Sequence, residues 1–212
     1  KEAQKYKKKF KVKIGVVTFD PIPKMFFNNK ITNYRISNFD QKVDYLNKFE
    51  VDFLINKNFN LQFSKITSHR FIIEILSKKL NAKYIFVSNN FRFGHKREGD
   101  VRQLIKYEKK YNYKIIKPKP LLIKKKIVSS TLIRKLLEVG NLKKANKLLN
   151  RYWTVEGKVQ RGKQLGKKIG FPTANIDIKN YVLACPGVYA VRVKMKNSYK
   201  TIKGIANLGY RP

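Results

Sequence analysis

The spacing of apolar residues divides the chain into two regions with different patterns. Up to about Asn150, short apolar runs that predict buried strands alternate with longer segments whose apolar residues recur at helical spacing. The expected strands are Lys13–Phe19, Val51–Ile55, Lys83–Val87 and Tyr113–Lys117. The expected helices are Lys1–Lys9, Phe39–Phe49, Ser68–Leu80, Asp100–Tyr111, Ser129–Asn141 and Leu142–Leu149. This alternation predicts a parallel sheet covered by helices on both faces.

Beyond Asn150 the helical spacing disappears, and long segments of β type replace it. The expected strands are Tyr152–Gly162, Gly187–Lys196 and Tyr199–Gly209. In the second of these, Val191, Val193 and Met195 alternate with basic residues, which is typical of an antiparallel strand with one buried face. We therefore expect two domains, an α/β domain over residues 1–150 and a β-barrel-like domain over residues 151–212.

The charge balance is strongly basic, with 49 Lys and Arg residues against 13 Asp and Glu residues and a formal net charge of +36. Such a charge attracts polyanions, including nucleic acids. However, Lys, Asn and Ile recur throughout the predicted helices, strands and loops, whereas nucleic-acid-binding proteins usually concentrate their charge on one face or tail. We therefore attribute the charge to the general composition of the chain, and a nucleic-acid-binding protein is the less favoured alternative.

The hydrophobic fraction of 42% is sufficient for a packed core. The single cysteine, Cys185, excludes a disulfide within the chain and suits a reducing cytosol, so we expect a cytoplasmic protein. The sequence contains no apolar run long enough to cross a membrane and no signal-peptide pattern. Because it begins with Lys1 and ends within the motif NLGYRP, we expect a fragment of a longer protein.

Two segments of the first region carry side chains suited to nucleotide binding. Ser88–Asp100 combines aromatic rings, amides and cations, which can stack on a flat ring, read its polar edge and contact phosphate. Val128–Arg134 places hydroxyl residues at the start of a helix, where backbone N–H groups favour an anion, with Arg134 one turn later. Taken alone, the first segment is equally compatible with a solvated loop anchored by buried Phe side chains, whereas the second is better explained by an ordinary helix cap.

The order of motifs along the chain resembles one bacterial family. The motifs, from about Ile14 to Pro212, are VVTFDPIPKMFF, FVSNNFRFGHKREGD, VSSTLIRKLLEVGNLKKANKLL, GKVQRGKQLGKKIGFPTANI, PGVYAVRV and GIANLGYRP. Together they resemble the bifunctional riboflavin kinase/FAD synthetase family. The resemblance implies a Rossmann-like α/β nucleotidyltransferase domain that adenylylates FMN to FAD, followed by a partial β-barrel riboflavin kinase domain that phosphorylates riboflavin to FMN. It also implies ATP as the co-substrate of both reactions, Mg²⁺ as their metal and no membrane partner.

The resemblance assigns binding residues to both domains. In the nucleotidyltransferase domain, the FMN- and ATP-binding residues would be Asp20, Pro21, Asn90, Phe91, Arg92, Ser129, Ser130, Thr131 and Arg134. In the kinase domain, the turn GFPTAN would bind Mg-ATP through Gly170, Phe171, Pro172, Thr173 and Asn175. Thr173 and Asn175 would offer side-chain oxygens to Mg²⁺, which prefers oxygen ligands, and the glycines would let the backbone approach the phosphates closely.

The sequence departs from the family pattern at several positions. The H-x-G-H signature of the nucleotidyltransferase and the glutamate base of the kinase are not among these residues, so we expect the catalytic groups of both activities to lie outside the chain. His69 and His95 do not supply the missing signature. Ile22 replaces a histidine of the family, Leu132 replaces Arg or Lys, and Asn90 replaces an aspartate. These substitutions leave open a degenerate homologue that binds flavin or ATP without turnover.

Overall fold

Each of the two units of the chain is built from two segments that are separated in the sequence. The computed structural model describes residues 1–162, 170, 172–196 and 198–209. Unit 1 holds Lys1–Lys30 and Val43–Leu121, whereas unit 2 holds Ile31–Lys42 and Leu122–Pro212. The helix α3 (Phe39–Asn47) spans one of the boundaries between these segments. The chain therefore enters unit 2 briefly, returns to unit 1 and then enters unit 2 again, and the boundary that we expected at Asn150 stays a prediction.

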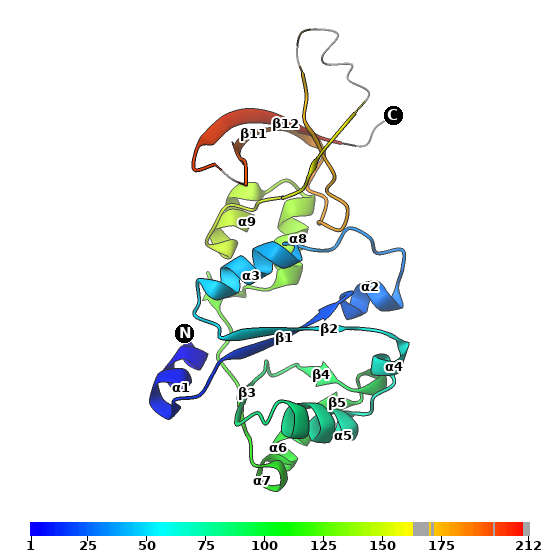
Figure 1. Ribbon diagram of the computed structural model, residues 1–212, viewed down its shortest axis with the longest axis vertical. Coiled ribbons are helices and arrows are strands. Elements are labelled where there is room, and N and C mark those ends of the chain that lie inside the picture. The colour runs from blue at the N-terminus through cyan, green and yellow to red at the C-terminus, as the bar shows by residue number, and fades with distance from the viewer. Residues whose placement is uncertain (163–169, 171, 197, 210–212) are drawn as a thin grey trace. The chain divides into compact units, whose positions relative to one another are not determined.

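Unit 1 contains the parallel strand pairs that the sequence predicts. β1 (Gly15–Asp20) pairs in parallel with β2 (Phe53–Asn58), and β3 (Tyr84–Phe86) pairs in parallel with β6 (Lys114–Ile116). Among the described residues, the two pairs are separate two-stranded ladders rather than one continuous sheet. Figure 1 shows β1 and β2 side by side, both ending on the side where α2 and α4 lie.

Unit 1 contains the helices α1 (Glu2–Phe10), α2 (Pro23–Phe27), α4 (Leu61–Ser64), α5 (Ser68–Arg70), the π-helical η1 (Phe71–Lys79), the short 3₁₀ turn η2 (His95–Arg97), α6 (Val101–Lys106) and α7 (Glu108–Tyr111). The predicted helices of unit 1 are present with small shifts at their ends, as α1, as α5 followed by η1, and as α6 followed by α7, whereas α2, α4 and η2 were not predicted. As predicted, Asp100 caps α6, because its side chain accepts a hydrogen bond from the Gln103 N–H at 3.0 Å. Ile72 and Leu104 are completely buried and form the centre of the unit 1 core.

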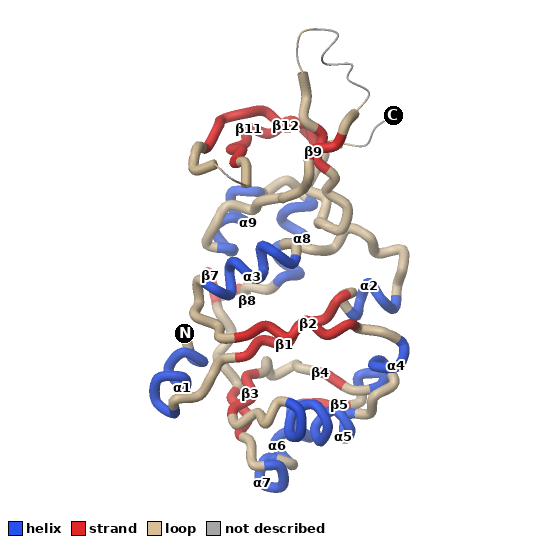
Figure 2. The backbone as a smooth tube through the Cα atoms, in the orientation of Figure 1, coloured by secondary structure: helices blue, strands red, loops and turns tan. Residues whose placement is uncertain are grey.

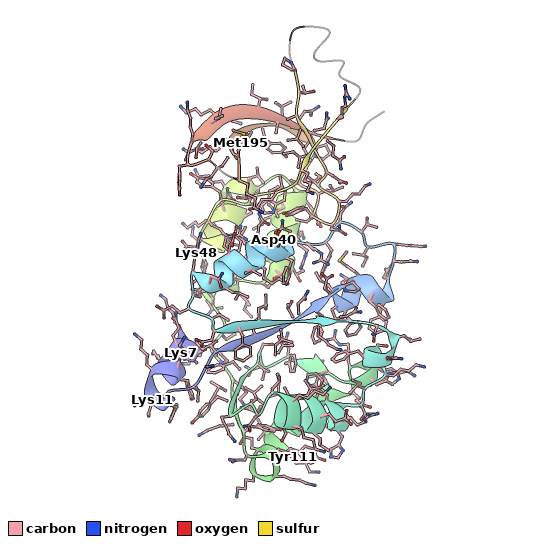
Figure 3. The ribbon with its side chains drawn as sticks, in the orientation of Figure 1. Lys7, Lys11, Asp40, Lys48, Tyr111 and Met195 are labelled. Carbon is pink, nitrogen blue, oxygen red and sulfur yellow. The ribbon has the colours of Figure 1, made fainter. Side chains whose placement is uncertain are left out.

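Asp52 anchors α1 to the start of β1. One carboxylate oxygen accepts a hydrogen bond from Lys7 Nζ at 2.7 Å, and the other accepts one from the backbone N–H of Ile14 at 2.6 Å. Lys7 is labelled on α1 in Figure 3. The bond from Lys7, followed by the bond from Ile14, lowers the pKa of Asp52 below its usual value of 3.8. Helix α1 is therefore held in place by a carboxylate that must stay ionised to bind both donors well.

Unit 2 is built around a helical hairpin. α8 (Ser130–Glu138) and α9 (Leu142–Leu149) match the two predicted helices, and Ser129 caps α8 by accepting a hydrogen bond from the Leu132 N–H at 3.2 Å. The turn between the helices uses Gly140, whose φ of 73° lies in the left-handed region that favours glycine. The apolar faces of the hairpin meet in a core formed by Ile133, Leu136, Leu137, Ala145 and Val182.

The described strands of unit 2 are arranged in antiparallel pairs, drawn in red in Figure 2. The pairs are β7 (Leu122–Ile123) with β8 (Lys126–Ile127), β9 (Val159–Gln160) with β10 (Asn175–Ile176), and β11 (Gly187–Lys194) with β12 (Thr201–Leu208). Unit 1 also has one antiparallel pair, β4 (Arg92–Phe93) with β5 (Gly99–Asp100). The β11–β12 hairpin confirms the second and third strands expected after Asn150. Each described strand belongs to a two-stranded sheet, so closure into a barrel stays a prediction.

Two expectations about the β region are wrong. The long strand expected over Tyr152–Gly162 is reduced to β9, because side chains bind the backbone that precedes it. The Trp153 N–H donates to Asn146 Oδ1 at 2.7 Å, and the Glu156 N–H donates to the hydroxyl of Tyr181 at 3.2 Å. The backbone N–H groups of Trp153 and Glu156 therefore bind side chains and do not take part in a strand ladder.

The buried face expected in the second strand is also shorter than predicted. It holds for Tyr189 and Val191, which are half-buried, whereas Val193 is 44% exposed and Met195, labelled in Figure 3, is 64% exposed. The alternation of apolar and basic residues therefore continues in the sequence beyond Val191, although the apolar side chains there are exposed in the described structure.

The segment Ile31–Lys42 is bound into unit 2 through the side chain of Gln41, which is 1% exposed. Gln41 Oε1 accepts hydrogen bonds from the Asn38 N–H at 2.9 Å and from the hydroxyl of Tyr181 at 3.0 Å. Gln41 Nε2 donates to the carbonyl oxygen of Thr154 at 3.0 Å. One buried amide therefore joins the first turn of α3 to two later parts of the chain.

The Gln41→Leu variant tests this network. Leu keeps much of the side-chain volume but leaves the hydroxyl of Tyr181 and the carbonyl of Thr154 without their partner, so we expect the free energy of unfolding to fall by about 2–4 kcal/mol. Urea unfolding followed by the fluorescence of Trp153, the only tryptophan, measures this change. The exposed Gln160→Leu in the same unit is the control, and an equal loss in both variants would contradict the role of the buried amide.

Asp52→Asn tests the anchor of α1 through its dependence on pH. Because the folded-state pKa of Asp52 is lowered, the carboxylate stabilises the protein above its usual pKa of 3.8, and this contribution is lost as the pH falls through the folded pKa. We expect the difference in unfolding free energy between the natural protein and the variant to be constant from about pH 5 to 7 and to shrink below about pH 4. Urea titrations followed by circular dichroism check this, and a difference that grows towards low pH would contradict it.

Candidate functional site

The end of β1 carries the first residues predicted to bind nucleotide. Asp20 is the last residue of β1, and its backbone carbonyl accepts a hydrogen bond from the Phe59 N–H at 3.0 Å. Pro21 follows, and Ile22 then precedes α2, where its carbonyl accepts a hydrogen bond from the Phe26 N–H at 3.0 Å. The side chain of Ile22 makes no capping hydrogen bond, so an apolar residue fits at this position.

Asn90, Phe91 and Arg92 form the second predicted group, on the approach to β4. The side chain of Asn90 accepts a hydrogen bond from Ser88 Oγ at 2.8 Å, and the guanidinium of Arg92 lies 3.9 Å from a carboxylate oxygen of Asp100. Asn90 and Arg92 are exposed, whereas Phe91 is half-buried. An amide and a guanidinium are therefore presented to solvent beside a partly covered aromatic ring.

The two phenylalanines of this segment have different surroundings. Phe93 is 7% exposed and belongs to the unit 1 core, so it is an anchor of the kind that the solvated-loop alternative required. Phe91 stacks on Phe93, with ring centroids 5.6 Å apart and an interplanar angle of 15°. Since one face of Phe91 already contacts Phe93, its other face and its edges are the parts suited to stack on a ligand.

The loop that follows is fixed against the start of α5. Gly94 has a φ of 77°, and a Cβ on it would lie 2.5 Å from the backbone nitrogen of Ser68. The Ser68 N–H donates to a carboxylate oxygen of Glu98 at 2.7 Å, and His95 Nδ1 lies 3.1 Å from the carbonyl oxygen of Ser64. His95 is thus part of the packing of this loop. The predicted residues Asn90–Arg92 therefore project from a loop that is tightly bound to a helix.

The third predicted group lies in unit 2, at the start of α8. Ser129 caps the helix, and Ser130 and Thr131 are exposed in its first turn. The N–H groups of a first helical turn and the helix dipole favour an anion at such a position. Leu132 is half-buried and packs against the unit 2 core, which explains an apolar residue where the family has a cation.

Arg134 is held by Tyr34, a partner that the sequence did not reveal. Arg134 Nε donates to the carbonyl oxygen of Tyr34 at 2.7 Å, and its guanidinium carbon lies 3.7 Å from the centroid of the Tyr34 ring. Burial lowers the pKa of Arg134, although an arginine stays charged at physiological pH. The charge therefore belongs to a half-buried side chain whose position is fixed by a stacked ring.

The predicted kinase residues lie around β10. Gly170 is exposed and has a φ of 83°, Pro172 and Thr173 are exposed, and Asn175 is half-buried as the first residue of β10. Phe171 lies outside the described residues. Asn175 stands opposite Gln160 in the antiparallel pair with β9. The turn therefore presents one exposed hydroxyl and one amide fixed by a strand.

The predicted residues are distributed over both units. Asp20, Pro21 and Asn90–Arg92 belong to unit 1, whereas Ser129–Arg134 and the residues of the turn GFPTAN belong to unit 2. Within the described ranges, no group of three or more His, Cys, Asp and Glu side chains could hold a metal ion. In the same part of the chain, no helix is long and apolar enough to span a membrane.

Comparison with known proteins gives matches over both parts of the chain. The family model of FAD synthetase matches residues 1–132, and the family model of riboflavin kinase matches residues 149–212. A solved structure from Streptococcus pneumoniae, named as a macrolide-efflux protein, has a TM-score of 0.80 and 28% identity and covers 98% of this chain and 67% of that one.

Several curated relatives are named bifunctional riboflavin kinase/FMN adenylyltransferase. The relative from Buchnera aphidicola subsp. Schizaphis graminum is 37% identical over 97% of this chain and 66% of its own length. The relative from Escherichia coli K12 is 35% identical over 94% of this chain and 63% of its own length. This chain thus spans roughly two thirds of the length of these relatives. The chain belongs to the FAD synthetase family, and its residues 149–212 match the riboflavin kinase family.

Proposed function

We propose that the protein acts in flavin cofactor synthesis, phosphorylating riboflavin to FMN and adenylylating FMN to FAD, with ATP as co-substrate of both steps. The observation that carries the proposal is the turn before β10, where Thr173 is exposed and Asn175 is held by the strand. Two oxygen-bearing side chains at fixed backbone positions, preceded by a glycine with positive φ, suit the phosphates of a nucleotide. The two matching families and the relatives named for both reactions support the same proposal.

The donor set of this turn fits a divalent cation carried by the nucleotide, and we infer that it is Mg²⁺. The described residues form no carboxylate or imidazole cluster able to hold a metal alone, and Mg²⁺ commonly takes only one or two protein ligands together with substrate phosphates. Thr173 Oγ1 and Asn175 Oδ1 are oxygen donors of the required kind. When bound, the cation would offset the charge that develops on the transferred phosphoryl group.

The residues of the chain contribute position and hydrogen bonds to the kinase step. In that step, a riboflavin hydroxyl oxygen attacks the terminal phosphorus of ATP, and ADP leaves. Asn175 is fixed by β10, so its amide needs little ordering when the nucleotide binds. Gly170, at a φ of 83°, allows the backbone to turn close to the phosphates.

For the adenylylation step, we infer separate roles for the groups in the two units. In unit 1, Phe91 would stack on a flat ring while Asn90 hydrogen-bonds its edge, and Arg92 would contact a phosphate. In unit 2, the first turn of α8 and the charge of Arg134 would bind a phosphate of the substrate nucleotide. Because Tyr34 already immobilises Arg134, little side-chain entropy is lost when an anion binds there.

The substitutions at Ile22 and Leu132 do not favour a degenerate homologue. Ile22 occupies a position where only its backbone accepts hydrogen bonds, and Leu132 packs against the unit 2 core. Both apolar side chains are therefore accommodated without leaving a polar partner unsatisfied in the surrounding structure. The two substitutions are therefore compatible with the fold, and the assays below decide between an active enzyme and a homologue that binds without turnover.

Thr173→Ala in the full-length protein tests the kinase assignment. Loss of one positioned oxygen should lower the rate of riboflavin phosphorylation by roughly 10²-fold, the scale of removing one preorganised group. FAD formation from supplied FMN should persist, because it uses the other set of residues. Thr173→Ser keeps the hydroxyl oxygen and should retain most of the activity. Chromatography of flavins after incubation with Mg-ATP measures both reactions, and unchanged phosphorylation in Thr173→Ala would contradict the assignment.

Arg134→Ala tests the adenylylation assignment in the same assay. Removal of the fixed charge should lower FAD formation by at least about 10-fold, since a charge-assisted contact to phosphate is worth roughly 1.5–3 kcal/mol. Riboflavin phosphorylation should change little. Arg134→Lys keeps the charge without the planar stack on Tyr34, and its rate of FAD formation should lie between those of the natural protein and Arg134→Ala. An equal loss of both activities would show instead that Arg134 only supports the structure of unit 2.

A further inference from the structure

We propose that Gly162 is a positioning residue for the nucleotide-binding turn, because the absence of a side chain at this position sets the orientation of the Asn175 amide. The inference rests on the proposed kinase function and adds a residue to it. Gly162 lies two positions beyond Gln160, which is paired with Asn175 across the β9–β10 ladder. The glycine is thus placed beside Asn175, the strand residue assigned to the nucleotide of the kinase step.

The contact between the two residues is close. A Cβ built on Gly162 would overlap with Nδ2 of Asn175 and would lie 3.1 Å from its Cγ and 3.6 Å from its Oδ1. A real Cβ does not approach a neighbouring atom so closely, so either the amide or the backbone has to move. The amide moves more easily, because the overlapped atom is at the end of a rotatable side chain.

Backbone conformation does not explain the glycine. The glycines with positive φ in the described residues are Gly94, Gly140 and Gly170, and Gly162 is not among them. The φ of Gly162 lies outside the left-handed region that favours glycine, so the constraint that the structure shows is the space occupied by the Asn175 amide. A substitution at this position should therefore leave the fold intact and redirect the amide.

Gly157, on the other side of β9, provides a contrast. A Cβ on Gly157 would lie 2.7 Å from Cγ2 of Ile176 and 3.0 Å from the backbone carbonyl oxygen of Asp177. The obstacle there includes backbone, which cannot turn aside, so alanine at 157 should disturb the β9–β10 pairing itself. Of these two glycines, Gly162 is the one that faces a side chain with a candidate ligand atom.

Redirecting the Asn175 amide would weaken its contribution in a specific way. The oxygen donor would no longer point where the strand places it, so the nucleotide and its cation would be held less well. We expect Gly162→Ala to raise the apparent KM for Mg-ATP and to lower kcat/KM for riboflavin phosphorylation by roughly 10- to 100-fold. FAD formation from FMN and the melting temperature should stay close to those of the natural protein.

The test is a double-mutant cycle in the full-length protein with Gly162→Ala, Asn175→Ala and the combined variant. If Gly162 acts through Asn175, its substitution should have almost no further effect once the amide is gone. Independent effects that multiply in the combined variant would overturn the inference. Gly204→Ala is the matched control, because the nearest atoms to a Cβ at that position are 3.8 Å away.

A second measurement separates this inference from the proposed function. The side-chain amide signals of Asn175 in an NMR spectrum should shift in Gly162→Ala and not in Gly204→Ala, whether or not the protein phosphorylates riboflavin. Unshifted signals would overturn the positioning role. If the signals shift while Asn175→Ala retains full kinase activity, Gly162 does position the amide, and the assignment of Asn175 to the nucleotide is what fails.

Discussion

The buried amide of Gln41 is the interaction on which the arrangement of unit 2 depends. Its oxygen binds the backbone of Asn38 and the hydroxyl of Tyr181, and its nitrogen binds the carbonyl of Thr154. A further hydrogen bond, from Trp153 Nε1 to the carbonyl of Ile36 at 3.0 Å, joins the same two parts of the chain as the bond between Gln41 and Thr154. The short segment Ile31–Lys42 is therefore a structural part of unit 2, although it lies within the residues matched by the FAD synthetase family model. A buried polar group costs free energy unless it is fully paired, so this network specifies one arrangement of these segments.

Acidic residues are scarce in this chain, and several of them have a structural role. With 13 Asp and Glu residues against 49 Lys and Arg residues, carboxylates cannot neutralise the basic charge by pairing with it. Several of them accept hydrogen bonds from backbone N–H groups: Asp52 from Ile14, Glu98 from Ser68, Asp100 from Gln103, and Glu108 from Ile115. The contacts to Ile14, Ser68 and Gln103 lie at the start of a strand or helix, where backbone donors lack partners within the element. The basic residues, in contrast, are mostly exposed and keep the surface charged.

Local patterns predicted the fold well, whereas contacts between distant residues were not predictable. Helix α8 was expected with its cap at Ser129 and its end near Gly140, because both signals lie within a few residues of the helix. The strand expected over Tyr152–Gly162 was wrong, since its backbone N–H groups at Trp153 and Glu156 donate to side chains outside the segment. In the candidate site, the role of the turn before β10 stays a prediction from the motifs, whereas the pairing of Arg134 with Tyr34 joins residues 100 positions apart and has no local signal. A glycine such as Gly162 likewise reveals its neighbour only when the structure places a side chain against it.

The path of the chain between its units has a consequence for synthesis on the ribosome. Gln41 and Tyr181, which share a hydrogen bond, are 140 positions apart. At translation rates of roughly 5–20 residues per second, Gln41 leaves the ribosome on the order of ten seconds before its partner exists. During that interval the Gln41 amide lacks Tyr181, and the core that Ile36 packs against lacks Val182, so unit 2 cannot yet close. The order of emergence, and not only the final contacts, thus determines when this protein is most exposed to aggregation.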